Sequence, residues 1–277
     1  MELMYLGSAA AEGWPALFCE CDACKEAARR GGRDIRMRTG SLLDGDILID
    51  FTPDLMAQKQ RFGLDLSGVR HCFLTHTHED HFEARNILWF GPVFANIRER
   101  EARGIFHFYA SEESRPEFEK RMFGELDGAD KLCDLTTFKP YERVEVSGRG
   151  FTAIPAVHGC VGAVNYIIDE GDRRILYAHD TGIWREETWE FMQGLKFDLV
   201  SLDCTNGPLA SDYSGHMGFE RNIYVRDRML KSGMADEHTR FIMNHFSHNG
   251  GMLYDEMARK VGPQGFEVGY DGMMMTL

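Results

Sequence analysis

The sequence predicts an α/β protein with four layers, in which two β-sheets pack face to face and helices cover both outer faces. Two observations carry this prediction: strand-rich runs alternate with helical stretches in each half of the chain, and the second half repeats the pattern of the first. Two amphipathic sheets bury their apolar faces in this way. The chain of 277 residues is long enough for such a core, and we expect one domain over residues 1–277.

The first half of the chain contains short strands with helices between them. Its strand-rich runs are residues 2–7, 39–50 and 69–75, and its helical runs are 21–30, 52–63 and 112–125. Asp44 and Gly45 are typical of a tight hairpin turn, so they divide the second run into two strands. Thr52 and Pro53 are expected to cap the second helix and to occupy its first position.

The second half shows the same alternation. Its strands are predicted near residues 151–157, 163–169, 173–178, 197–202, 240–245 and 266–270. Its helices are predicted near residues 186–194, 216–232 and 251–261. The chain has no repeat of 20 to 50 residues and no linker rich in Pro, Gly or Ser, which agrees with one domain.

Composition limits the partners and the compartment. The formal net charge of -13 argues against a surface that follows a nucleic-acid backbone, so a small anionic substrate fits better than a nucleic-acid polymer. No apolar run approaches the roughly 20 residues that a membrane span needs, and the segment MELMYLGSAAAEG lacks a signal-peptide pattern. We therefore expect a cytoplasmic protein without membrane attachment, whose seven cysteines are reduced thiols or metal ligands.

A dense group of polar side chains follows the predicted strand 69–75. The run FLTHTHEDHF contains His76, His78, Asp80 and His81 within six positions. Two residues apart in an extended segment, His76 and His78 point to the same side, and Asp80 and His81 can face the same cavity after a turn. Imidazole and carboxylate together suit borderline divalent metals. Packing alone gives no reason for this spacing, so the run predicts a metal site.

Further ligands are available at the ends of later strands. His158, Asp180 and His245 each end an apolar, strand-like run. Taken singly, each also fits an ordinary structural role, as a loop residue, a turn cap and a core histidine respectively.

A second constellation lies near the start of the chain, where Cys19, Cys21 and Cys24 have C-x-C-x-x-C spacing. Structural zinc takes four ligands, and His248, three residues after His245, is the candidate for the fourth. A redox pair or unliganded buried cysteines are the alternatives.

The order H-x-H-x-D-H, a single histidine, an aspartate in D-T-G and a late histidine resembles the metallo-β-lactamase superfamily of metal-dependent hydrolases. The resemblance implies a metallo-β-lactamase-like α/β/β/α sandwich that holds two divalent ions. It assigns His76, His78 and His158 to one ion. It assigns Asp80, His81 and His245 to the other, with Asp180 bridging the two. Asp50 matches an aspartate behind the ligands, although DFTPD departs from the glycine usual after it.

A narrower resemblance covers nearly the whole chain. The segments LGSAAAEGWPALFCECDAC, NHFSH and GFEVGYDGM are similar to the PhnP-type phosphodiesterases, which hydrolyse a cyclic phosphodiester of phosphoribose. This group has a Cys3His zinc site that matches Cys19, Cys21, Cys24 and His248. The stretch LDCTNGP followed by His216 resembles the one that supplies a histidine near the scissile phosphate.

The expected function is therefore hydrolysis of a small phosphodiester, cyclic or not, by a hydroxide that bridges two metal ions. Asp80 and His216 are the expected catalytic residues, with His216 as the acid for the leaving group. Zinc or manganese suits the active-site ligands, iron or nickel also fits, and one further zinc is structural. An oxidase or oxygenase related to pyrroloquinoline quinone biosynthesis protein B and an RNA-processing nuclease are the alternatives. A homodimer stays open.

Overall fold

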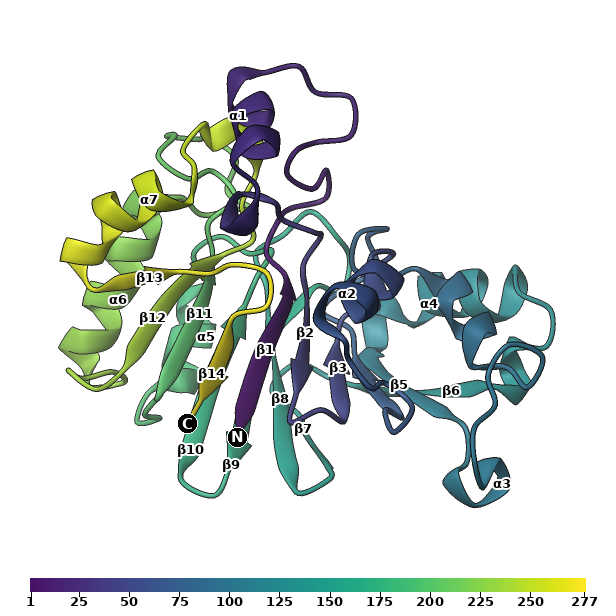
Figure 1. Cartoon of the computed structure of the whole chain (residues 1–277). Coiled ribbons are helices and arrows are strands. Elements are labelled where there is room, and N and C mark those ends of the chain that lie inside the picture. Colours follow the sequence, from purple (N-terminus) through teal and green to yellow (C-terminus); the bar gives the residue numbers. More distant parts are fainter.

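The structure is a computed structural model that describes all residues from Met1 to Leu277. Two seven-stranded sheets form its centre (Figure 1). The first sheet has the order β14-β1-β2-β3-β4-β5-β6. Its strands are β1 (Glu2–Gly7), β2 (Gly40–Leu43), β3 (Ile47–Ile49), β4 (His71–Phe73), β5 (Phe106–Ser111), β6 (Cys133–Phe138) and β14 (Met274–Thr276).

The second sheet has the order β13-β12-β11-β10-β9-β8-β7. Its strands are β7 (Arg143–Val146), β8 (Arg149–Pro155), β9 (Val164–Glu170), β10 (Arg173–Ala178), β11 (Leu199–Asp203), β12 (Arg240–Asn244) and β13 (Phe266–Val268). The strands β10 to β13 are parallel neighbours, and β9 runs antiparallel to both β8 and β10. The carboxyl ends of β8, β10, β11 and β12 therefore lie at one edge of this sheet.

Helices occupy the connections between strands. The α-helices are α1 (Asp22–Arg30), α2 (Leu55–Phe62), α3 (Arg100–Arg103), α4 (Arg115–Glu119), α5 (Glu186–Met192), α6 (Phe219–Ser232) and α7 (Tyr254–Val261). The 3-10 helices are η1 (Gly32–Asp34), η2 (Ala84–Phe90), η3 (Glu112–Ser114), η5 (Ala129–Lys131), η6 (His248–Gly250) and η7 (Gly262–Gln264), and η4 (Lys120–Gly124) is a π-helix. None of the helices combines the length and the apolar composition that crossing a membrane requires.

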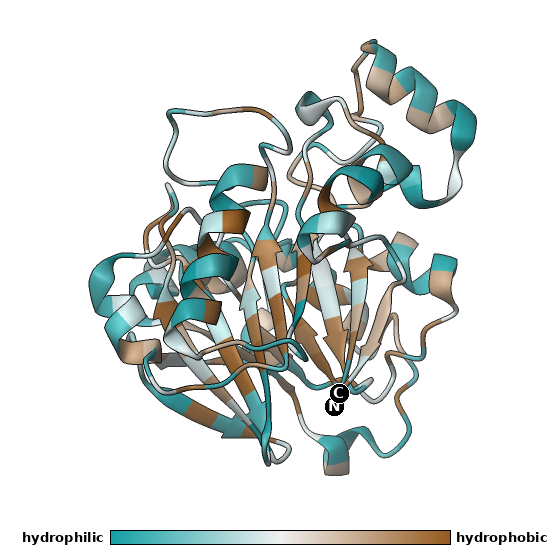
Figure 2. Cartoon of the chain, turned by 90° about the vertical axis from the view of Figure 1, so that its left-hand side faces the viewer, coloured by the Kyte–Doolittle hydropathy of each residue, from teal (hydrophilic) through white to brown (hydrophobic).

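Three buried apolar clusters show that the molecule has four layers. The cluster between the sheets includes Phe73 of β4 and Phe151 of β8, whose rings stack with centroids 3.7 Å apart. A second cluster packs helices α5 to α7 on the outer face of the second sheet, and a third packs η2, α4 and η4 on the first. Figure 2 shows hydrophobic residues concentrated on the strands, whereas the outer helices are largely hydrophilic. The predicted α/β/β/α sandwich is confirmed.

Most predicted elements lie close to their predicted ranges. Asp44 and Gly45 have positive φ values of 47° and 77° in the β2–β3 turn, so the hairpin is confirmed. The start of the second helix was wrong, because α2 begins at Leu55. Thr52 Oγ1 nevertheless accepts a hydrogen bond from Asp54 N–H at 3.4 Å, as the predicted cap would, whereas Asp54 makes no side-chain capping bond. The strands β5, β6, β7 and β14 lie outside the predicted segments.

The two ends of the molecule differ. Both chain termini lie at the lower ends of the strands in Figure 1, where Leu277 N–H donates to the Met1 carbonyl at 3.0 Å. The N-terminal loop and α1 cover the opposite, upper end. The predicted ligand residues follow strands at that upper end.

Candidate active site

Loops after the carboxyl ends of the strands bring the predicted ligands together from both sheets. The run from His76 to His81 follows β4, His158 follows β8, Asp180 follows β10 and His245 follows β12. The backbone of these loops is not constrained by pairing with a neighbouring strand. Their polar side chains can therefore all point into one cavity at the ends of the two sheets.

Three histidines form the first ligand group. The Nε2 of His76 and the Nε2 of His158 lie 3.0 Å and 3.2 Å from the Nδ1 of His78. Ring nitrogens this close to one another suit a shared cation, because imidazole ligates metals through a nitrogen lone pair. The geometry therefore brings together the three residues predicted for one ion.

Asp80, His81, Asp180 and His245 form the second group, and their ligand atoms lie within 4.8 Å of one another. The Oδ2 of Asp180 lies 2.5 Å from His81 Nε2, 3.1 Å from His245 Nε2 and 3.6 Å from His76 Nε2. Asp180 thus touches both groups, as a bridging carboxylate would.

Partners behind the histidines decide which nitrogen faces the cavity. The Nδ1 of His81 lies 2.7 Å from Asp50 Oδ2, and the Nδ1 of His158 lies 3.3 Å from the Gly215 carbonyl. The Nδ1 of His76 lies 3.0 Å from Thr75 Oγ1. A proton on each Nδ1 leaves the Nε2 lone pair free, and such pairing is the usual way in which proteins orient metal-ligating histidines.

Two buried nitrogens test whether the site fits a metal. The Nε2 atoms of His81 and His245 are buried and make no hydrogen bond of good geometry, although Asp180 Oδ2 lies only 2.5 Å and 3.1 Å from them. A buried polar atom without a partner costs about 1–3 kcal/mol. Both atoms face the Asp180 carboxylate, so a divalent cation at this point would satisfy them. The residues present therefore fit two divalent ions.

The carboxylates around the second group favour positive charge at this point, either as a proton on His245 or as a bound cation. Burial opposes protonation of His245, but the Asp180 and Asp203 carboxylates outweigh it and raise the pKa of His245 to about 10. Burial similarly opposes ionisation of Asp180, yet His245 and His81 hold its pKa well below the ordinary value. Burial lowers the pKa of His76 well below its ordinary value, so this imidazole is neutral.

Three residues around these groups have left-handed backbone conformations. The φ values are 67° for Asp50, 51° for Asp180 and 59° for His245. Non-glycine residues in this region cost of order 1–3 kcal/mol each and cluster at functional sites. The fold thus holds these three residues in a backbone conformation that non-glycine residues otherwise disfavour.

Asp203, at the end of β11, was not predicted and connects two of the histidines. Its Oδ2 lies 3.1 Å from His216 Nδ1 and 3.4 Å from His245 Nδ1. Thr205 Oγ1 donates to the same oxygen at 2.9 Å and lies 2.8 Å from His245 Nδ1. In the sequence, Asp203 lies in the LDCTNGP stretch and follows a predicted strand, but no role was assigned to it.

His216 lies beside the metal groups, at the start of the segment that leads into α6. Its Nδ1 is 3.4 Å from Asp180 Oδ1, and its ring centroid is 5.1 Å from that of His158. Gly182 permits this approach, because a Cβ atom there would lie 1.7 Å from the Ser214 carbonyl oxygen. The D-T-G glycine therefore lets the 211–216 loop reach Asp180.

Arg121 in η4 fixes the loop that carries the H-x-H-x-D-H run. Its guanidinium donates to the Thr77 carbonyl at 2.7 Å and to the Phe82 carbonyl. The Phe82 ring also stacks on Phe118 of α4, with centroids 5.0 Å apart. The segment η4 is a short π-helix, and such segments often occur at functional sites.

A pocket of about 500 Å³ opens over the ligand groups. Its lining includes Tyr213 and His216 as well as Glu12, Ser247 and Asn249. Its volume lies in the range of small-molecule sites, about 300–1,000 Å³. The pocket thus offers room for a small substrate beside the predicted ions.

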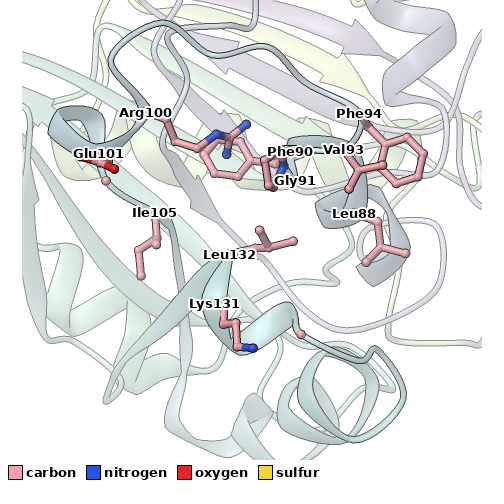
Figure 3. Close-up of a pocket in the computed structure, with 13 residues that line it drawn as sticks. Leu88, Phe90, Gly91, Val93, Phe94, Arg100, Glu101, Ile105, Lys131 and Leu132 are labelled. Carbon is pink, nitrogen blue, oxygen red and sulfur yellow. The ribbon is translucent and has the colours of Figure 1, made fainter.

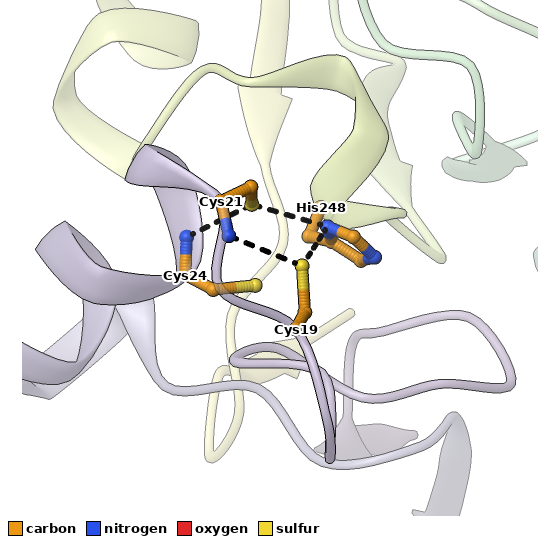
Figure 4. Close-up of side chains that lie close together, drawn as sticks. All are labelled: Cys19, Cys21, Cys24 and His248. Atoms are coloured by element: carbon orange, nitrogen blue, oxygen red, sulfur yellow. Dashed lines mark hydrogen bonds between the residues drawn. The ribbon is translucent and has the colours of Figure 1, made fainter.

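The predicted cysteine cluster also comes together (Figure 4). The Nδ1 of His248 lies 3.7 Å from Cys19 Sγ and 3.5 Å from Cys21 Sγ. Zinc bonds of about 2.3 Å to sulfur and about 2.0 Å to nitrogen, at tetrahedral angles, would place these atoms about 3.5 Å apart. A hydrogen bond from the Cys24 backbone N–H lowers the pKa of the Cys21 thiol to about 6. The four residues fit a zinc ion.

A cavity of about 570 Å³ lies elsewhere, around the 88–105 segment (Figure 3). Phe90, Phe94 and Leu132 line it together with Arg100 and Lys131. None of its lining residues belongs to the metal groups, so it takes no part in the chemistry derived above.

Comparison with known proteins identifies the family. A family model described as the beta-lactamase superfamily domain matches residues 46–238, more than half of the chain. The chain belongs to this superfamily. Members of the superfamily are metal-dependent hydrolases, and the His and Asp groups described above could hold the metal. No curated protein sequence matches the chain.

Solved structures of other superfamily proteins share the fold over the whole chain. A diphosphatase from the PhnP family is 22% identical, with a TM-score of 0.75, and covers 100% of this chain and 97% of its own. Zn²⁺-bound PqqB from Methylobacterium extorquens is 21% identical, with a TM-score of 0.75 and 100% coverage of both chains. The short form of human tRNase Z is 15% identical, with a TM-score of 0.67, and covers 100% of this chain and 99% of its own. At these identities the likeness establishes the fold alone.

Proposed function

We propose that the protein is a phosphodiesterase that hydrolyses a small phosphodiester, cyclic or linear, at a centre of two divalent ions. The observation that carries the proposal is the pair of ligand groups joined by Asp180, in which two buried Nε2 atoms face the Asp180 carboxylate without a hydrogen bond of good geometry. The similarity to a PhnP-family diphosphatase supports a phosphorus-containing substrate.

In this proposal, His76, His78 and His158 hold one ion, and Asp80, His81 and His245 hold the other. Asp180 bridges them. When bound, two divalent ions would supply a water ionised near neutral pH and positive charge for the phosphoryl oxygens. Zinc or manganese suits these ligands, and iron or nickel also fits.

His216 is proposed to protonate the oxygen of the leaving group. Asp203 Oδ2 lies 3.1 Å from its Nδ1, which leaves Nε2 as the atom that can give a proton to the substrate. Burial opposes protonation of His216, but the Asp203 and Asp180 carboxylates outweigh it and raise its pKa. A protonated imidazole near neutral pH suits a general acid.

The cysteine cluster is proposed to hold one structural zinc. It links the N-terminal loop to η6, two parts of the chain that are more than 200 residues apart in sequence. A metal that joins them would stabilise the upper end of the molecule without taking part in catalysis.

The test is hydrolysis of bis(p-nitrophenyl) phosphate and a panel of cyclic phosphodiesters by protein loaded separately with zinc, manganese, iron or nickel. We expect turnover with at least one metal, and its loss in Asp180→Ala but not in Asp130→Asn, which changes an exposed aspartate. Oxygen uptake by the iron-loaded protein without phosphodiester hydrolysis would instead favour the oxidase class. Cleavage of precursor tRNA alone would favour the nuclease class.

A further inference from the structure

One charged side chain on the pocket wall has no part in the metal groups. Glu12 lies in the loop between β1 and α1 and lines the pocket together with Ser247 and Asn249. Ser247 Oγ donates a hydrogen bond to Glu12 Oε1 at 2.5 Å, and His248 Nε2 lies 3.8 Å from the same oxygen. No donor within the protein reaches Oε2. Glu12 therefore has free acceptor capacity at the pocket.

The backbone around Glu12 holds it in place. Ala10 N–H donates to the Phe246 carbonyl, and Phe246 N–H donates to the Ser8 carbonyl, both at 2.9 Å. This bridge joins the loop to the segment that carries Ser247, whose side chain is buried. The carboxylate is thus presented by two segments that are fixed to each other, and it needs little reordering to receive a ligand.

The charge of Glu12 limits what it can bind. A carboxylate accepts hydrogen bonds and donates none, and it repels the phosphoryl group of an anionic substrate. Glu12 therefore suits a donor on a part of the substrate that is remote from phosphorus. An ammonium group is one such donor, but the cations expected in the same pocket would repel it. A hydroxyl is neutral, and the Ser247 hydroxyl already makes this contact with the same carboxylate.

We propose that Glu12 is a specificity-determining residue that accepts a hydrogen bond from a hydroxyl group of the substrate. Asn249, on the same wall, offers an amide that can both donate to and accept from such a hydroxyl. The inference rests on the proposed phosphodiesterase function and deepens it. It restricts the substrates to phosphodiesters of hydroxylated alcohols, and it disfavours those of plain alkyl, aryl or amino alcohols.

The experiment measures binding by titration calorimetry to zinc-loaded protein, using three phosphate monoesters of the product type. These are glycerol 3-phosphate, propyl phosphate and 3-aminopropyl phosphate, which share a three-carbon chain and differ in its substituents. We expect the wild type to bind glycerol 3-phosphate about tenfold more tightly than propyl phosphate, the size of one hydrogen bond to a charged group. In Glu12→Ala this ratio should fall to about one, and in Glu12→Gln it should be intermediate.

Glu125→Ala is the matched control, because Glu125 is exposed and lines no part of the pocket. It should keep the wild-type ratio, and metal content should be equal in all variants. The same ratio in the wild type and Glu12→Ala would overturn the inference, as would the absence of binding by either neutral-chain ester. Tighter binding of 3-aminopropyl phosphate would overturn the hydroxyl assignment.

Turnover of phosphodiesters, measured in parallel, separates this inference from the proposed function. Hydrolysis without a preference for the hydroxylated ligand would remove the role of Glu12 and leave the phosphodiesterase proposal intact. A preference that depends on Glu12, in a protein that hydrolyses no phosphodiester, would support the hydroxyl contact and remove the proposed reaction.

Discussion

At the scale of single residues, the site depends on which nitrogen of each histidine is free. Asp50 Oδ2 accepts a hydrogen bond from His81 Nδ1, and Asp203 with Thr205 faces the Nδ1 of His245. Both Nε2 atoms then face Asp180 without a hydrogen bond of good geometry. The carboxylates behind the histidines therefore orient the proposed centre.

Asp203→Asn tests this dependence. The amide keeps the size of the side chain but loses the charge that orients His245 and His216, so we expect metal affinity and turnover to fall about 10–100-fold. Isothermal titration of the metal-free variant with zinc measures the first effect. Asp130→Asn serves as the control, and an unchanged affinity in Asp203→Asn would contradict the orienting role.

His216→Ala should separate catalysis from metal binding. The variant is expected to retain its metal, because His216 belongs to neither ligand group, while turnover falls about 10²–10⁴-fold through loss of the acid. Metal content and the rate on a substrate with an alkoxide leaving group are measured together. A variant that turns over at the wild-type rate would leave no acid role for His216.

The sequence indicated the candidate ligands more directly than the residues that contact them. His76, His78, Asp80 and His81 are adjacent in the chain, so their spacing alone indicated a metal site. The contacts of Asp203 with His216 and His245 form only when β11, β12 and the 211–216 loop meet in three dimensions. Such contacts between distant segments leave no local pattern.

At the scale of elements, the loop after β4 is held by a helix on the outer face of its own sheet. Arg121 donates to the carbonyls at both ends of the 77–82 segment, and Phe82 packs on α4. The cation in η4 therefore fixes the turn that presents three ligands to the cavity.

Arg121→Ala is expected to leave both carbonyls without their donor. We expect a loss of about 1–3 kcal/mol in the free energy of unfolding, together with weaker metal binding, and a smaller effect for Arg121→Lys. Urea denaturation and zinc titration measure the two effects. Lys120→Ala, which removes an exposed neighbouring cation, should change neither quantity. An Arg121→Ala protein with the stability and zinc affinity of Lys120→Ala would contradict the role of Arg121 in holding the loop.

Tertiary contacts explain where the predicted elements were wrong or missing. Arg38 donates to both carboxylate oxygens of Asp54, at 2.7 Å and 3.0 Å, and this ion pair fixes Asp54 just before the first residue of α2. The strand β14 consists of Met274, Met275 and Thr276, which have no strong strand signal and become a strand by pairing with β1. The longer β5 and β6 were missed in a region whose pattern was ambiguous.

At the scale of the whole molecule, both sheets contribute strained turns to the candidate site. Asp50 belongs to the first sheet, whereas Asp180 and His245 follow strands of the second, and all three have left-handed conformations. The two sheets must therefore pack together before the site exists. Metal ions bound between them should stabilise this packing.

Removal of the metals should accordingly lower the stability of the entire fold. A ligand present at about 1,000 times its Kd stabilises the native state by about 4 kcal/mol. We expect chelation to lower Tm by several degrees and re-addition of zinc to restore it, as measured by calorimetry. A Tm that does not respond to chelator or zinc would show that the sheets do not depend on bound ions.

The most direct test of the account is the metal content of the purified, folded protein by elemental analysis after incubation with zinc and gel filtration. We predict three ions per chain in the wild type, two in Cys24→Ala and one in a variant that combines His76→Ala with Asp180→Ala. Folded wild-type protein that retains no divalent ions would contradict the account at its centre.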